Sequence, residues 1–168
     1  MQTKVLEPSA CTDEVLESFC SLVHEGGQVI SHGLEDRVKK AFALAFVHDE
    51  AKLAAVGALK HPDAGYRAST FEKAGAGEDP TAFPYELGWI FVAHAYQGRR
   101  LSRLPVEALL PLVSDKQLYS TSHVERIRMH NTLRRYGFTQ VGAPYDSDTD
   151  DHKLILFLRR VPTSATER

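Results

Sequence analysis

The residues most able to do chemistry lie in one window, residues 86–102, which reads ELGWIFVAHAYQGRRLS. Its aromatic and β-branched content predicts a buried strand over Tyr85–Val92, followed by the basic turn Gln97–Arg100 and then directly by a helix. Free backbone amides at a helix start attract phosphate oxygens, and the arginines of this turn, with Arg103, would add full charges. The window therefore predicts a pyrophosphate site, and a solvated basic turn is the alternative interpretation.

Hydrophobic spacing along the rest of the chain predicts the elements that must position this window. The order of these elements is β-α-α-β-β-β-α-β-α-β-β, without an internal repeat, which indicates a mixed α/β sheet with helices on its faces. We expect one domain over residues 1–161 and a flexible tail over 162–168. Strands are expected at 5–6, 41–47, 51–59, 85–92, 117–121, 138–142 and 153–160, and helices after Thr12, over 34–40, from Gly98 to about Val113 and from Ser122 to Tyr136.

Three local signals refine this outline. Pro105 would disrupt a helix anywhere past its first turn, so the helix near it should begin late or kink. Ser122 and Glu125 have the S-x-x-E spacing of a capping box, which predicts a helix start there.

The segment 62–84 is rich in Pro, Gly and Ala and lacks sustained periodicity. It predicts a long loop, either a lid over a substrate or a disordered insertion.

The window also resembles motif A of the Gcn5-related N-acetyltransferase (GNAT) superfamily. That motif has a valine, then five residues later a glutamine or arginine followed by x-x-G-x-G or A, and here it is matched by Val92 and Gln97–Ser102. The glycine-phenylalanine pair that ends the superfamily's last helix is matched by Gly137 and Phe138. The resemblance runs from Val5 to about Arg160. It implies a mostly antiparallel sheet of about seven strands with about four helices, and a cofactor cleft where the fourth and fifth strands splay apart.

The resemblance implies acetyl-coenzyme A (acetyl-CoA) as the ligand of that cleft. Its pantetheine would contact the fourth strand, and its pyrophosphate would contact the motif A amides. Two departures from the motif, Arg100 for glycine and Ser102 for glycine or alanine, are expected to weaken binding, and Arg100 is tolerable if its backbone stays helical. The cofactor-binding residues so implied are Phe91, Val92, Ala93, Gln97, Gly98, Arg99, Arg100, Leu101, Ser102, Arg103 and Asn131.

Two residues are predicted to be catalytic, Glu86 and Tyr136. Glu86 occupies the fourth-strand position at which several members of the superfamily carry a general-base glutamate, and the alternative is a glutamate at a strand start that faces solvent. The superfamily's usual acid, a tyrosine four residues before the glycine of the pair, is replaced here by Leu133. Tyr136 is the candidate acid in its place, Tyr96 and Tyr119 are the other candidates, and water is the alternative proton source.

The predicted function is direct acetyl transfer from acetyl-CoA to an amine, with Glu86 acting through a water. Acidic residues on the loops expected near the acceptor favour a small cationic amine, and a protein amine is the other acceptor left open. The alternative is a weak or inactive acyl-CoA-binding regulatory module of the same fold. The superfamily's tendency to dimerise makes a homodimer one expected state.

Composition excludes several other classes. The 168 residues carry 20 Lys and Arg against 22 Asp and Glu, so the net charge of -2 gives no reason to expect a nucleic-acid or anionic-membrane partner. No apolar run spans a bilayer and the amino terminus has no signal-peptide core, so we expect a cytoplasmic protein. No metal is expected, because the chain has neither C-x-x-C nor H-E-x-x-H, and the acidic turn 146–151 departs from a calcium loop.

Overall fold

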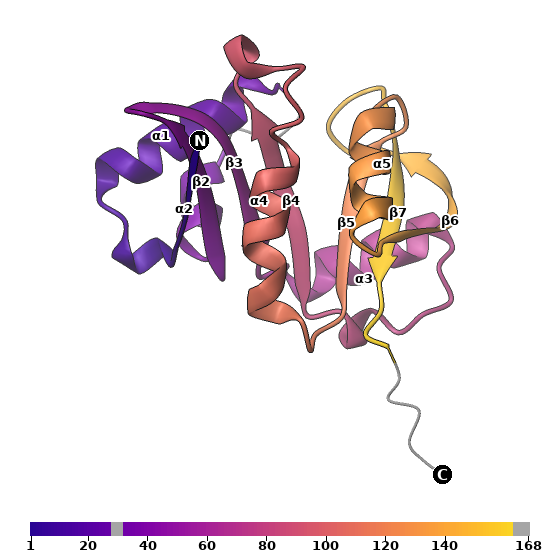
Figure 1. Cartoon of the computed structure of the whole chain (residues 1–168). Helices are drawn as coiled ribbons and strands as arrows, with labels where there is room; N and C mark the ends of the chain where they lie inside the picture. Colours follow the sequence, from indigo (N-terminus) through magenta and orange to yellow (C-terminus); the bar gives the residue numbers. More distant parts are fainter. Residues whose placement is uncertain (28–31, 163–168) are drawn as a thin grey trace.

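A seven-stranded sheet forms the centre of the molecule in the computed structural model, which describes residues 1–27 and 32–162. The strand order is β1-β2-β3-β4-β5-β7-β6, and five α-helices of the described residues cover its two faces (Figure 1). The strands are β1 (Gln2–Leu6), β2 (Ala43–Asp49), β3 (Lys52–Lys60), β4 (Tyr85–Val92), β5 (Leu118–His123), β6 (Thr139–Asp146) and β7 (Lys153–Arg159). The helices are α1 (Asp13–Glu25), α2 (Leu34–Lys39), α3 (Ala64–Ala74), α4 (Arg103–Leu109) and α5 (Ile127–Arg135).

The one parallel pair of this sheet is β4 with β5, and all other neighbours are antiparallel. The two parallel strands pair only at Tyr85 with Leu118 and at Glu86 with Tyr119, and beyond these positions they diverge. The edge of each strand that faces away from the gap stays paired, since β4 continues along β3 and β5 continues along β7. A mostly antiparallel sheet with a splayed β4–β5 pair, as expected, is confirmed.

Alternating side chains give the sheet two apolar faces. On one face, α1 and α2 pack over Phe46, Trp89 and Phe91, and α3 packs over Tyr119 and Leu156. The other face is covered by α4 and α5, whose buried side chains lie against β2, β4, β5 and β7. In Figure 1 α4 and α5 lie in front of the sheet, and α3 lies behind it. The gap between β4 and β5 therefore lies between α3 on one face of the sheet and α4 and α5 on the other.

Segment 62–84 is not the long loop that its composition predicts. It forms α3, which begins after Asp63, whose carboxylate accepts a hydrogen bond from the Tyr66 amide at 3.2 Å. The helix ends at Gly75, a left-handed C-cap with φ of 71°. Only one face of α3 is apolar, with Phe71 and Ala74 buried, which explains why the periodicity is weak. Its packing also overturns the disordered-insertion alternative.

Two predicted helix starts shift in the structure. The helix expected from Gly98 begins at Arg103, so Pro105 lies in its first turn, as the late-start prediction required. The capping box at Ser122 is wrong, because β5 runs on to His123 and α5 begins at Ile127. Ser122 is a buried strand residue, and pairing of β5 with β7 overrides the local helix signal.

The first predicted cap, by contrast, is confirmed: the Thr12 hydroxyl accepts a hydrogen bond from the Val15 amide at 3.2 Å. Residues 163–168 of the predicted tail lie outside the described residues. Among the residues that the structure describes, no helix is long and apolar enough to cross a membrane.

Candidate active site

A cleft of about 960 Å³ opens between β4, the segment that leads into α4, and α5. The C-terminal half of β4 forms one wall, and α5 forms the opposite wall. The lining residues are Ile90, Phe91, Val92, Gln97, Gly98, Arg100, Leu101, Ser102, Arg103, Glu125, Arg126, Ile127, Arg128, Met129, Asn131, Thr132, Arg135 and Tyr136. Nine of the predicted cofactor-binding residues, Phe91, Val92, Gln97, Gly98, Arg100, Leu101, Ser102, Arg103 and Asn131, are among them.

Two predicted cofactor residues do not line the cleft, Ala93 and Arg99. The Ala93 amide donates to the Ala54 carbonyl at 2.8 Å, so it extends the pairing with β3. The Arg99 guanidinium lies over the Tyr96 ring, 5.2 Å from its centroid. Both residues flank the cleft without facing it.

The turn that precedes α4 has two residues in the left-handed region, Gly98 with φ of 84° and Arg100 with φ of 58°. The condition set for Arg100, a backbone that stays right-handed helical, is therefore not met. Glycine adopts this conformation freely, whereas an L-residue with a side chain is strained there by about 1–2 kcal/mol. Arg100 thus keeps the backbone shape that glycine favours while adding a cation to the cleft.

Free backbone donors lie along this turn. Within the described part of the chain, the amides of residues 98–102 donate no hydrogen bond to another backbone carbonyl. The Gln97 side-chain amide donates to the Val92 carbonyl at 3.3 Å, which ties the turn to the end of β4. Unpaired amides beside a cleft bind anionic oxygens.

The charge of the lining is strongly positive. Arginines line the cleft at positions 100, 103, 126, 128 and 135, and Glu125 is the one acidic residue among the lining residues. The three arginines from the α5 region were not predicted as site residues. Their signal in the sequence is the basic run from Arg126 to Arg135, but only the fold shows that it faces the turn that precedes α4.

Glu86 lies on the opposite, α3 face of the sheet, at the last paired position before β4 and β5 diverge. It is 3% exposed, so the solvent-facing alternative is wrong. Its carboxylate lies 3.3 Å from the Lys60 ammonium and accepts a hydrogen bond from the Tyr119 hydroxyl at 3.5 Å. One residue further along, the Ser120 hydroxyl donates to the Leu87 carbonyl at 2.8 Å across the gap.

Three tyrosines surround the Glu86 carboxylate on this face. Its negative charge raises the pKa of Tyr66, and burial raises the pKa of Tyr119 and Tyr145, with Glu86 as the second cause for both. All three phenols therefore remain protonated near neutral pH. They offer hydroxyl groups around Glu86 and no competing negative charge.

Tyr136 contributes its side chain to the cleft from the end of α5. Its hydroxyl donates to the Glu107 carboxylate at 2.5 Å, and Glu107 also pairs with Arg103 at 2.9 Å. Burial, followed by this hydrogen bond, raises the pKa of Tyr136, so the phenol keeps its proton. Leu133, which occupies the superfamily's tyrosine position, is fully buried in the core.

Solved structures of other proteins share this architecture. ElaA of Escherichia coli superposes with a TM-score of 0.69 at 14% identity, covering 95% of this chain and 100% of that one. The ribosomal-protein-S18-alanine N-acetyltransferase of Escherichia coli matches with a TM-score of 0.68 at 10% identity, over 99% of both chains. The chain has the GNAT fold.

A third GNAT structure was solved with its cofactor. YncA of Salmonella typhimurium with acetyl-CoA matches with a TM-score of 0.63 at 11% identity, covering 100% of this chain and 98% of that one. No protein-family model and no curated protein matches the sequence. The GNAT fold is therefore recognised through the arrangement of elements and the splayed pair of strands, at 10–14% identity to these three structures.

Proposed function

We propose that this protein is an N-acetyltransferase that transfers the acetyl group of acetyl-CoA directly to an amine. The observation that carries the proposal is the arginine-lined cleft, bordered by free amides, beside the gap between β4 and β5. Coenzyme A carries several phosphate charges, which such a cleft complements. Structural neighbours that are acetyltransferases by name support the same reaction.

In this proposal, different residues of the cleft contact different parts of acetyl-CoA. Unpaired edges of β4 and the side chains of Ile90 and Val92 suit the extended pantetheine arm. The amides of residues 98–102, with Arg100 and Arg103, suit the pyrophosphate. Asn131 and the arginines of α5 close the cleft from the other side.

Glu86 is the proposed base and Tyr136 the proposed acid. Bound acetyl-CoA supplies the thioester whose carbonyl carbon the amine attacks. A C–N bond forms while the C–S bond breaks, and the amine proton passes through a water to Glu86. Tyr136, after releasing Glu107, gives its proton to the departing thiolate. Glu86 and the cleft lie on opposite faces of the sheet, so amine and thioester would meet through the β4–β5 gap.

The acceptor is proposed to approach from the α3 face. A second cavity there, of about 80 Å³, is lined by Tyr66 and Tyr145 and by the carboxylates of Asp146 and Asp148. Asp146 and Asp148 already pair with Lys153 and Lys73 at 2.7 Å, so the acidic loops hold less free charge than the sequence indicates. These contacts favour a neutral or singly charged amine over a polycation.

The deciding experiment combines calorimetric titration with acetyl-CoA and a free-thiol assay against small amines, polyamines, aminoglycosides, amino acids and peptides. We expect saturable binding, and thiol release that requires one class of amine. Glu86→Gln should keep binding and lose at least about a hundredfold in kcat, whereas Glu17→Gln, an exposed change on α1, should match the wild type. Absence of acetyl-CoA binding would overturn the proposal.

The second candidate is an acyl-CoA-binding regulatory module. It is favoured by the strained Arg100 in a glycine position and by Leu133 in place of the usual acid. Acetyl-CoA binding without thiol release for any amine of the panel, with Glu86→Gln indistinguishable from the wild type, would support it.

A further inference from the structure

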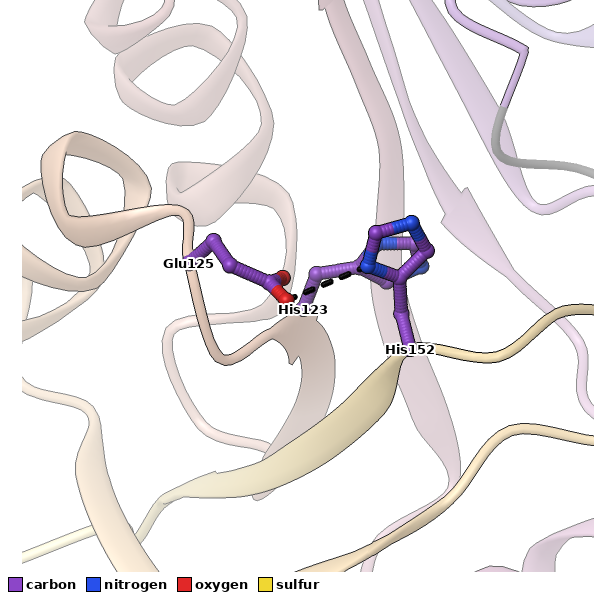
Figure 2. Close-up of side chains that lie close together, drawn as sticks. All are labelled: His123, Glu125 and His152. Carbon is purple, nitrogen blue, oxygen red and sulfur yellow. Dashed lines mark hydrogen bonds and ion pairs between the residues drawn. The ribbon is translucent and has the colours of Figure 1, made fainter.

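We propose that His123, Glu125 and His152 bind a divalent cation of the zinc class at the outer end of β5. His123 is the last residue of β5, Glu125 lies in the connection to α5, and His152 immediately precedes β7. Figure 2 shows the two stacked imidazole rings, one behind the other, and the Glu125 carboxylate pointing toward them. The inference of this site does not rest on the acetyl transfer proposed above.

The geometry of the three side chains is close to that of a metal site. One potential ligand atom from each residue lies within 4.8 Å of the other two. The His152 Nδ1 atom lies 3.1 Å from Glu125 Oε1, and the rings of His123 and His152 stack at 4.9 Å between centroids. Ligands of a tetrahedral zinc ion at about 2.0–2.1 Å are separated by about 3.3 Å. A movement of about 1 Å or slightly more therefore brings all three onto one ion.

The side chains differ in how freely they can make that movement. His123 is 7% exposed and fixed in the strand, and the His130 ring nitrogen donates to the His123 carbonyl at 2.9 Å. Glu125 and His152 are 59% and 53% exposed, so their rotamers can change without disturbing the core. One fixed ligand with two adjustable ligands can close on an ion at small cost to the fold.

The chemistry of the donor set points to zinc over harder cations. Two imidazoles and one carboxylate suit zinc and related transition metals, whereas magnesium and calcium prefer oxygen ligands throughout. A fourth donor is at hand, because the Asp150 carboxylate lies 3.6 Å from His123 Nε2. With Asp150 the set becomes two nitrogens and two oxygens, which fits four-coordinate zinc.

Such an ion would join parts of the chain that are distant in sequence. It would connect the β5–α5 segment to the turn between β6 and β7, where the Ser147 amide donates to the His152 carbonyl at 3.1 Å. Glu125 also lines the cleft, so the ion would hold one wall of that cleft in place. The expectation of no metal rested on the absence of C-x-x-C and H-E-x-x-H motifs, whereas these ligands are brought together only by the pairing of β5 with β7.

The test uses the full chain after dialysis against a chelator, titrated calorimetrically with zinc chloride. We expect one site per chain that His152→Ala and Glu125→Gln each weaken by at least about tenfold. His24→Ala, an exposed histidine on α1, should bind as the wild type does. The midpoint of thermal unfolding should rise by about 5 °C in the wild type and in His24→Ala when free zinc is about a hundredfold above the wild-type Kd, and by about half as much or less in the two ligand variants.

The comparison of variants separates this site from adventitious binding to the other histidines or to Cys11 and Cys20. Adventitious sites persist unchanged in all four proteins, so the proposed site appears as the one whose affinity falls in His152→Ala and Glu125→Gln and not in His24→Ala. Cobalt should give a tetrahedral visible spectrum that is lost in His152→Ala. Equal zinc stoichiometry and affinity in the wild type, His152→Ala and Glu125→Gln would overturn the proposal, as would a wild type that binds no zinc.

Discussion

The Glu86 carboxylate lies 3.3 Å from the Lys60 ammonium, across a register pair that joins β3 to β4. The glutamate side chain is 3% exposed and the lysine side chain 21%, so water screens this ion pair only weakly. The same ammonium lies 4.5 Å from the centroid of the Trp89 ring. Lys60 therefore fixes the proposed base at the point where β4 and β5 separate.

Removing the Lys60 ammonium should destabilise the folded protein. Lys60→Met leaves a buried carboxylate without its cation, and we expect the free energy of unfolding to fall by about 3 kcal/mol, measured by urea denaturation. Glu86→Gln alone should cost less, and the double variant should recover part of the loss, with a coupling energy of about 1–3 kcal/mol. Strictly additive effects of the two changes would contradict a direct interaction.

Two substitutions of Arg100 can measure the effect of its charge and the effect of its strained backbone separately. Because its φ is 58°, Arg100→Gly should be more stable than Arg100→Ala by about 1 kcal/mol in urea denaturation. Both variants lose the same cation from the cleft, so both should bind acetyl-CoA more weakly and with a smaller dependence on salt. If the glycine variant instead binds more tightly than the wild type, then backbone shape outweighs the arginine charge.

The sequence was most informative where local chemistry and tertiary packing agree. The strand over Tyr85–Val92 was predicted with its observed bounds, because its apolar and β-branched residues belong to the strand that crosses the middle of the sheet. The cap at Thr12 is equally local. The motif A window identified eight residues that line the cleft, since strand, turn and helix follow one another along the chain.

Features that depend on distant partners were not predictable in this way. Ser122 and Glu125 have the spacing of a capping box, yet β7 draws Ser122 into the sheet and leaves Glu125 near His152. Lys60 as the partner of Glu86 follows from strand register, which one sequence does not reveal. The basic face of α5 becomes part of the cleft only because that helix lies on the same face of the sheet as α4.

Gly142 should be far less tolerant of substitution than its φ of 65° alone indicates. A Cβ at this position would lie 1.9 Å from the Ala74 carbonyl oxygen, where α3 meets β6. We expect Gly142→Ala to lower the free energy of unfolding by at least about 3 kcal/mol. Gly75→Ala is the matched control, because φ is 71° there and no atom lies within 4 Å of the new Cβ.

The control isolates the cost of the left-handed backbone, about 1–2 kcal/mol. Gly75 is the C-cap of α3, and Gly142 of β6 lies against the same end of that helix. Both changes add the same single methyl group. Equal losses in urea denaturation would show that the contact between β6 and α3 relaxes freely.

The hydrogen bond from Tyr136 to Glu107 predicts a pH dependence that a change in packing alone would not produce. This bond, followed by Arg103, lowers the pKa of Glu107, so the stability it contributes is present above the ordinary glutamate pKa of about 4.3. That contribution is lost as pH falls through the lower folded-state value. Tyr136→Phe should therefore cost about 1 kcal/mol at pH 7, a figure discounted for the 40% exposure of Glu107.

The cost of Tyr136→Phe should shrink as the pH falls below about 4, since Glu107 then becomes protonated in both proteins. Urea denaturation of the two proteins between pH 3 and pH 8 measures this difference. Glu107→Gln is the control, because its amide oxygen still accepts from Tyr136 but does not titrate.

In kinetics, an acid role for Tyr136 predicts that Tyr136→Phe lowers kcat about a hundredfold while Glu107→Gln does not. Equal kcat in the wild type and Tyr136→Phe would assign the thiolate proton to water.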